Sequence, residues 1–342
     1  MKKVLALFFI VIGLGVGAKV ALHMYLAQPT GLQKNALFWV KKGSSFNGVA
    51  QQLQKRGVVA NASLFAKIGR FYGYDKKLKF GEYQMTSEMT YDDVYKKITS
   101  GDSFRYSVTF VEGDHIYDYA RILEKKGLCK KKDFLALVKN TGFIKKILGE
   151  RQKTLEGYLF PDTYSFSKVD GAKKMIKTMV SRFFTKTKSL GFSNSKLSRH
   201  QAVTLASIIE KETGAAFERP LISSVFHNRM KKKMRLQTDP TIIYGILDKT
   251  GREITNIRKK DIRAPTAYNT YVIKGLPPGP IANPGFESLK AALNPKKSDF
   301  LYFVSQNDGT HVFSKTYKAH QGAVRKYQLN PKRRQRKKSK KR

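Results

Sequence analysis

The apolar positions of segment 198–214 repeat at the spacing of an α-helix. One stripe of such a helix carries these apolar residues together with a single carboxylate, Glu210. The apolar residues are Ala202, Val203, Ala206 and Ile209. Ser198 and Gln201 have the spacing of an N-terminal capping box, and Gly214 is typical of a helix end. The pattern therefore predicts a helix whose apolar face ends in a carboxylate.

The longest apolar run lies at the start of the chain, over residues 4–27, and only Lys19 and His23 interrupt it. A run of about 20 apolar residues spans a bilayer. The lysines within residues 1–3 hold that end in the cytoplasm, because positive charge stays on the cytoplasmic side. The run predicts a single-pass anchor in the cell inner membrane.

The alternative interpretation of this run is a cleaved signal peptide. Residues 4–18 have the length of the apolar part of such a peptide, and residues 16–18 are small. We favour the anchor because apolar residues continue past Lys19 for long enough to span a bilayer. Under both interpretations, the region after residue 30 is periplasmic, that is, extracytoplasmic.

The pattern of residues 38–68 returns 70 residues later without a gap. Seven positions match at this offset: Gly43 with Gly113, Ala50 with Ala120, Leu53 with Leu123, Lys55 with Lys125, Gly57 with Gly127, Leu64 with Phe134, and Ala66 with Ala136. Each copy reads as strand, turn, helix, glycine and helix, with the apolar matches on the inward face. The offset predicts a duplicated βα region over residues 36–190. The alternative is a chance likeness between short strand–helix units.

Residues 191–330 mix helical and strand-like patterns. Asp239, directly before a proline, reads as a helix start. Residues 267–281 are irregular and rich in proline and glycine, and the runs 300–304 and 311–313 read as a final hairpin. The predicted fold class is α+β, with a membrane helix, the duplicated βα region, and then a mixed α+β domain.

Charge and composition add few constraints on function. The chain has 342 residues and a formal net charge of +41, which favours nucleic acid, anionic lipid or an acidic wall polymer without choosing among them. An exported region cannot meet chromosomal DNA, so we expect no nucleic-acid partner. The densest basic block predicts a disordered tail over residues 331–342.

Cysteine and histidine usage gives no sign of a metal or a disulfide. The single cysteine, Cys129, excludes an intramolecular disulfide. The six histidines have no metal-ligand spacing, so we predict no metal site, and we expect no cofactor.

Glu210 is the candidate with the clearest chemistry. A carboxylate beside a helix C-terminus is disfavoured by the backbone dipole, and apolar neighbours also favour the neutral acid. An acid that stays protonated near neutral pH is what cleavage of an acetal bond requires. The alternative is a solvated last turn, because Glu-Lys-Glu is also ordinary surface sequence.

Five blocks of sequence resemble the YceG-like family, the endolytic murein transglycosylases: 155–164, 205–213, 234–241, 268–271 and 275–285. The likeness covers roughly residues 35–328. It implies a LysM-like region over 36–190, followed by a catalytic domain over 191–330 with one essential glutamate, whose counterpart here is Glu210. The basic tail is not part of the family pattern.

The resemblance implies cleavage of peptidoglycan between N-acetylmuramic acid and N-acetylglucosamine, with formation of a 1,6-anhydro ring. Glu210 would serve first as acid and then as base, whereas Glu212 points about 200° away on the same helix. Five residues have the donors, acceptors and flat faces to line a glycan cleft: Gln237, Asp239, Tyr244, Asn269 and Tyr271. Each also has a structural interpretation, in which tyrosines pack, amides hold loops and Asp239 caps a helix.

The expected partners are peptidoglycan glycan strands, the inner membrane and, from location, wall synthases. One rival hypothesis is a wall-binding scaffold without catalysis that holds glycan through the duplicated region. Another is an exported nucleic-acid or anionic-lipid binder whose binding depends on charge and weakens steeply with salt.

Overall fold

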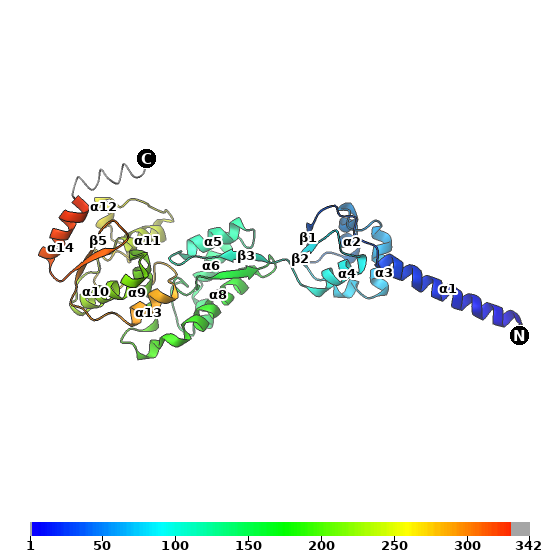
Figure 1. The fold of residues 1–342 in the computed structure, drawn as a ribbon, viewed down its shortest axis with the longest axis horizontal. Helices are drawn as coiled ribbons and strands as arrows, with labels where there is room; N and C mark the ends of the chain where they lie inside the picture. Colours follow the sequence, from blue (N-terminus) through cyan, green and yellow to red (C-terminus); the bar gives the residue numbers. More distant parts are fainter. Residues whose placement is uncertain (1, 330–342) are drawn as a thin grey trace. The chain divides into compact units, whose positions relative to one another are not determined.

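The computed structural model describes residues 2–329, so the predicted tail over 331–342 lies outside the described residues. The chain forms two compact units. Unit 1 is Met1–Ser107 with Ser165–Gly171, and unit 2 is Val108–Tyr164 with Ala172–Arg342. Helices and short strands occur in both units (Figure 1), which confirms a mixed α+β structure that begins with an apolar helix.

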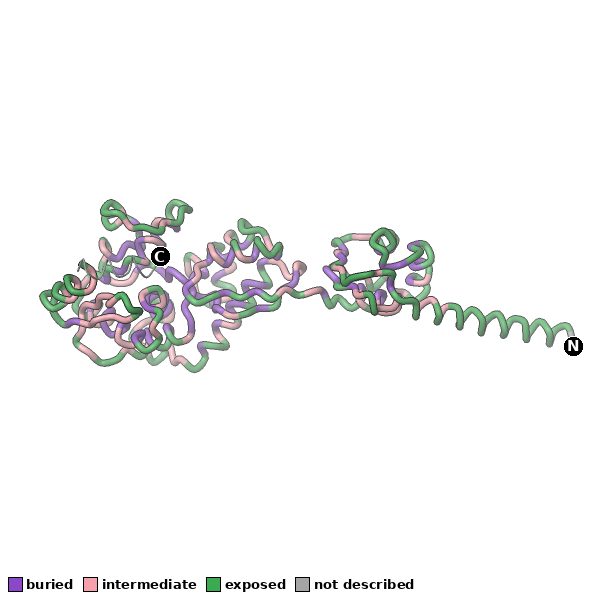
Figure 2. The backbone as a smooth tube through the Cα atoms, turned by 45° about the horizontal axis from the view of Figure 1, so that its top comes forward, coloured by how far each residue is buried: buried purple, intermediate pink, exposed green. Residues whose placement is uncertain are grey.

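Unit 1 begins with α1, Lys2–Leu26, which is exposed from residue 3 to residue 21 (Figure 2). Its composition and length suffice to cross a membrane. The chain then passes directly into the packed part of the unit. Thr30 donates its backbone N–H to the carbonyl of Met89 at 2.8 Å, and the ring of Tyr25 lies 5.1 Å from that of Tyr91. The end of α1 is thereby fixed to the unit.

The rest of unit 1 is a two-stranded antiparallel sheet covered by helices. Strand β1, Ala36–Val40, pairs with β2, Gly81–Met85. Their alternating buried side chains pack on three helices: α2, Phe46–Lys55; α3, Ala62–Phe71; and α4, Tyr91–Ser100. The short 3-10 helix η1, Asp75–Lys77, precedes β2. Stacked rings of Phe65 and Tyr95, with centroids 4.0 Å apart, lie in the core.

The same order of elements recurs at an offset of 70, since β1 begins at Ala36 and β3 at Tyr106. Strand β3, Tyr106–Thr109, pairs with β4, Thr163–Phe166, and the division between the units runs through both strands. Four helices belong to this stretch: α5, Ile116–Lys125; α6, Lys131–Val138; α7, Thr141–Leu148; and α8, Gly171–Thr187. Helices α5 to α7 pack within unit 2. The LysM-like character of 36–190 and the limits of the domain over 191–330 stay predictions.

The remainder of unit 2 is built around α9, Arg199–Glu212, whose residues 202–209 are all buried. It packs against α10, Arg219–Lys231, α11, Asp239–Thr250, and α13, Phe286–Leu293. Strands β5, Tyr302–Ser305, and β6, His311–Ser314, form the expected antiparallel hairpin. The other elements are short: η2, Lys188–Leu190; η3, Phe192–Asn194; η4, Ala216–Glu218; α12, Lys259–Ile262; α14, Tyr317–Val324; and the π-helical η5, Arg325–Leu329.

The ends of α9 and α11 differ in part from the expectation. The capping box is confirmed, because Gln201 N–H donates to Ser198 Oγ at 3.2 Å and Ser198 N–H to Gln201 Oε1 at 2.9 Å. Gly214 does not end the helix, because Thr213 already leaves α9 in an extended conformation. Asp239 is the first residue of α11 rather than its N-cap, a position that Thr238 occupies.

Candidate active site

Glu210 lies in the last turn of α9, at the edge of the unit 2 core. Burial of the apolar face fixes the helix, and only 5% of the Glu210 side chain is exposed. Both oxygens have donors. Arg219 Nη2 donates to Oε1 at 3.0 Å, and the backbone N–H of Gly285 donates to Oε2 at 2.9 Å. The side chain is therefore held in one orientation.

A cavity of about 640 Å³ opens beside Glu210. Its lining comes from four stretches of unit 2: Phe110–Val111–Glu112–Gly113, Pro161, Glu210–Lys211–Glu212–Thr213–Gly214, and Arg219. This volume is within the range of small-ligand sites. The walls combine apolar surface with both signs of charge, so the cavity can bind a polar, largely uncharged ligand.

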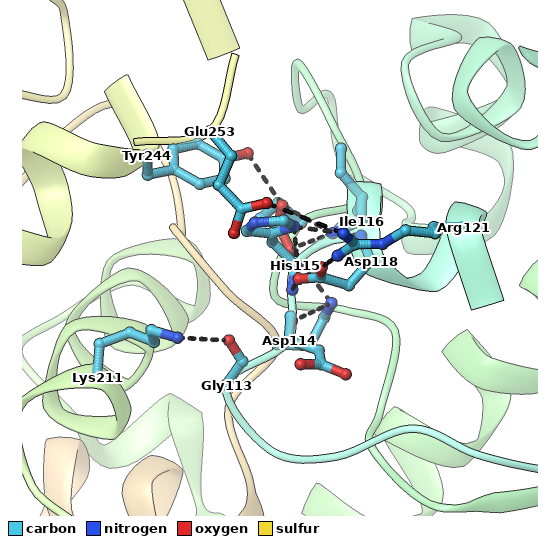
Figure 3. A network of polar contacts seen from close by, with 11 residues as sticks. Gly113, Asp114, His115, Ile116, Asp118, Arg121, Lys211, Tyr244 and Glu253 are labelled. Atoms are coloured by element: carbon cyan, nitrogen blue, oxygen red, sulfur yellow. Dashed lines mark hydrogen bonds and ion pairs between the residues drawn. The ribbon is translucent and has the colours of Figure 1, made fainter. Parts of the chain in front are cut away.

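The turn over residues 110–114 forms one wall, and backbone contacts hold it. Gly113 has φ +85°, which only glycine adopts without strain. Its N–H donates to the carbonyl of Asn283 at 3.0 Å, and its own carbonyl accepts from Lys211 Nζ at 3.1 Å (Figure 3). Because Lys211 follows Glu210 on α9, this contact couples the turn to the helix that carries the acid.

A buried carboxyl group, that of Glu156, contacts residues that adjoin this turn. It accepts from the backbone N–H of Ile116, from Tyr244 Oη at 3.0 Å and from Asn283 Nδ2 at 3.2 Å. Figure 3 shows Ile116 and Tyr244 among the residues of this polar network. Burial raises the pKa of Glu156 to about 7, although His115 and these donors oppose the rise. The cluster joins α5, α11 and the loop before α13.

Of the sequence-predicted site residues, Glu210 lines the cavity and the other five do not. Tyr244 is buried and bonded to Glu156, and Asn269 is buried with its amide on the carbonyl of Ala264 at 2.8 Å. Tyr271 donates to Asp239 Oδ1 at 2.7 Å, and Gln237 is a turn residue with φ 52°. A glycan-binding role for Gln237, Asp239, Tyr244, Asn269 and Tyr271 stays a prediction.

Four charged residues of the cavity were not among the predicted site residues: Glu112, Lys211, Glu212 and Arg219. Arg219 begins α10, its side chain is 11% exposed, and its buried Nε has no hydrogen-bond partner among the described residues. Glu212 belongs to the cavity lining, but its carboxyl group accepts from the hydroxyl of Thr238, which does not. Desolvation raises the pKa of Glu212 to about 7.

Glu218, an acid beyond α9, packs away from the cavity. Its Oε1 accepts from the backbone N–H of His311 at 2.8 Å, and its Oε2 lies 2.7 Å from His311 Nδ1. It therefore joins the start of α10 to β6. Within residues 2–329, no group of three or more side chains of the metal-ligating types lies together.

Comparisons with known proteins place these observations in a family. The model of the YceG-like family matches residues 38–326. A protein of Bacillus subtilis (strain 168) named endolytic murein transglycosylase is 35% identical over 305 residues, which cover 84% of this chain and 83% of that protein. A protein of Streptococcus pneumoniae R6 with the same name is 28% identical over 320 residues, covering 84% of this chain and 57% of its own length.

A solved structure agrees with these sequence matches. The crystal structure of a yceG-like protein from Listeria monocytogenes has a TM-score of 0.57 and 34% sequence identity to this chain. The match covers 85% of this chain and all of that one. The match to the family model extends over both units, from Phe38 in β1 to Lys326 in η5. The chain belongs to the YceG-like family.

Proposed function

We propose that this protein is a membrane-anchored, endolytic peptidoglycan lytic transglycosylase. It cleaves the bond between N-acetylmuramic acid and N-acetylglucosamine and leaves a 1,6-anhydromuramyl end. The names of two relatives support the reaction class. The observation that carries the proposal is the position of Glu210, a nearly buried carboxyl group that faces a cavity and is held by two donors.

The proposed reaction has two proton transfers, and Glu210 performs both. As an acid it protonates the glycosidic oxygen, so that the bond from that oxygen to C1 of the muramyl residue breaks and N-acetylglucosamine leaves with a hydroxyl group. As a carboxylate it then takes the proton of the muramyl C6 hydroxyl, whose oxygen bonds to C1. The carboxyl group regains its proton, so no water is consumed and no second catalytic acid is needed.

The donors around Glu210 suit the stage of the reaction between the two proton transfers. Once its proton has left, the carboxylate faces the Arg219 guanidinium and the N–H of Gly285, and both stabilise negative charge. Arg219 is also part of the cavity lining, while its Nε is buried without a hydrogen-bond partner among the described residues. This arrangement lowers the free energy of the state in which the proton has been transferred.

Location follows from α1. We propose that α1 anchors the protein in the inner membrane and that both units lie on the extracytoplasmic side, where peptidoglycan is assembled. The substrate is then the glycan strand near the membrane, and the enzymes that synthesise the wall there are candidate partners. The length and composition of α1 support the anchor.

The test is digestion of isolated peptidoglycan by the full chain, with mass spectrometry of the products. Glu210→Gln keeps the size of the side chain but cannot supply the proton, so we expect formation of anhydromuramyl ends to fall by about 10²–10⁴-fold. The matched control is Glu88→Gln, the same change at an exposed acid of unit 1, which we expect to leave the rate unchanged.

Two outcomes would contradict the proposal. If Glu210→Gln produced anhydromuramyl ends at the rate of the unchanged protein, Glu210 would not be the acid. If the unchanged protein bound peptidoglycan without producing such ends, it would act as a wall-binding scaffold.

A further inference from the structure

A second carboxyl group, that of Glu112, faces the cavity that Glu210 lines. It comes from the turn between β3 and α5, far in sequence from α9. Its side chain is 51% exposed, whereas that of Glu210 is 5% exposed. Both carboxyl groups approach the same nitrogen of Arg219: Nη2 is 3.0 Å from Glu210 Oε1 and 3.9 Å from Glu112 Oε2. One guanidinium thus faces two acids.

Gly285 brings the two acids together a second time. Its backbone N–H donates to Glu210 Oε2. A Cβ atom at Gly285 would lie only 1.8 Å from Glu112 Oε1, so the Glu112 carboxyl group lies directly against Gly285 and would have to move away from any larger residue there. Contacts to Arg219 and Gly285 therefore confine Glu112 and Glu210 to one end of the cavity.

The groups that hold Glu210 raise a problem for its first task. Arg219 and the N–H of Gly285 both stabilise the ionised carboxylate, whereas protonation of a glycosidic oxygen requires the neutral acid. The C-terminus of α9 acts in the opposite sense, but a helix terminus contributes little. A negative charge nearby would oppose the effect of these two donors, and the Glu112 carboxylate supplies such a charge.

We propose that Glu112 is a positioning residue for the proton of Glu210. Its carboxylate competes for Arg219 and repels a second negative charge, so that Glu210 keeps its proton until the glycosidic oxygen takes it. The inference rests on the proposed function. It adds a second carboxyl group to a reaction that formally needs one, and this second group acts through charge rather than by exchanging a proton with the substrate.

The surrounding charges support this coupling. Burial raises the pKa of the Glu112 carboxyl, and the Glu210 carboxylate raises it further, while Arg219 lowers it. The other charged groups nearby are Glu287 on α13 and, on α9, Lys211 and Glu212. Two acids that interact in this way titrate as a pair rather than singly.

The duplicated pattern gives an independent indication that the position is specialised. At the offset of 70, Glu112 corresponds to Lys42, while the glycine that follows is the same in both copies, Gly43 and Gly113. Both glycines have positive φ, so the two turns share their backbone form. Only the copy that faces Glu210 carries an acid at this position.

The test is the dependence of kcat/KM on pH, measured for the full chain on isolated peptidoglycan. Glu112→Gln removes the charge and keeps the size, so Glu210 should lose its proton at a lower pH. We expect the alkaline limb of the profile, on which kcat/KM falls, to shift to lower pH by about one unit. At a given pH on that limb, kcat/KM should fall about tenfold. Lowering the pH should restore the activity of this variant.

Two variants complete the experiment. Glu112→Asp keeps the charge, so it should return the limb toward that of the unchanged protein. Glu287→Gln makes the matched change at an exposed acid outside the cavity lining, and we expect a much smaller shift. Circular dichroism of each variant shows whether it is folded.

An alkaline limb in Glu112→Gln that coincides with that of the unchanged protein would overturn the inference. So would a folded Glu112→Gln variant that is inactive at every pH, because Glu112 would then act directly on the substrate. Activity retained by Glu210→Gln is a different result, since it would remove the proposed function whatever Glu112 does.

Discussion

Glu156 is a carboxyl group enclosed by donors on three different segments. Its folded-state pKa is about 7, and its ordinary value is 4.5. The folded chain therefore holds this proton up to about pH 7, whereas the unfolded chain releases it near pH 4.5. The stability that this proton contributes is fully present below pH 4.5 and is lost as the pH rises to about 7.

Glu156→Gln should therefore flatten the pH dependence of stability. A neutral amide does not titrate, so we expect the melting temperature of the variant to fall by a few degrees less than that of the unchanged protein between pH 4.5 and 7.5. Glu212, whose pKa is also about 7, leaves a residual slope. Thermal unfolding followed by circular dichroism measures this, and equal slopes would contradict the assignment.

The sequence pointed to Glu210 because a helical stripe and a family pattern converge on it. The two groups that donate to Glu210, the Arg219 guanidinium and the N–H of Gly285, could not be identified from the sequence in this way. Gly285 lies 75 residues further on, in a loop whose path depends on the packing of α13 against α9. The helical angle indicated that Glu212 points away from Glu210, and its carboxyl group accepts from Thr238, which is not part of the cavity lining.

At the scale of elements, the contact of α9 with the loops around it places the acid. Gly157 lies at this contact with φ +84°. A Cβ there would come within 2.6 Å of both Val203 on α9 and Pro280 in the loop before α13. The close approach explains why this position, within the first block that resembles the family, has no side chain.

Gly157→Ala should therefore destabilise unit 2 through two effects, an unfavourable φ and a steric clash. We expect a loss of about 2–4 kcal/mol in the free energy of unfolding. Gly149→Ala is the matched control: its φ is +78°, but nothing lies within 4 Å of the added carbon. It should cost only about 1 kcal/mol. Denaturant titration measures both, and equal losses would contradict the role of the clash.

Elements defined by local patterns were predictable. The capping box of α9 and the β5–β6 hairpin depend on neighbours in sequence, and both are confirmed. Predictions that depend on where the chain goes next were less accurate. Gly214 was expected to end α9, but Thr213 leaves the helix first, and Thr238 rather than Asp239 is the N-cap of α11.

At the scale of the whole molecule, the proposed anchoring by α1 makes a prediction about location. If α1 spans the inner membrane with residues 1–3 inside, protease added outside wall-free cells should digest the chain after residue 30. A variant without residues 4–27 should stay in the cytoplasm and be protected. Full protection of the unchanged chain in intact wall-free cells would contradict the proposed orientation.

The direct connection between α1 and the rest of unit 1 has a mechanical consequence. Backbone contacts begin at Gln28, whose carbonyl accepts from Tyr91 N–H at 3.0 Å, and continue through Pro29 and Thr30. With α1 in a bilayer, no flexible linker separates the membrane helix from the rest of unit 1, which therefore stays at a fixed distance from the lipid. One extra helical turn ahead of Gln28 would lift it by about 5 Å. If α1 is the proposed anchor, its length therefore sets the distance at which unit 1 is held from the lipid.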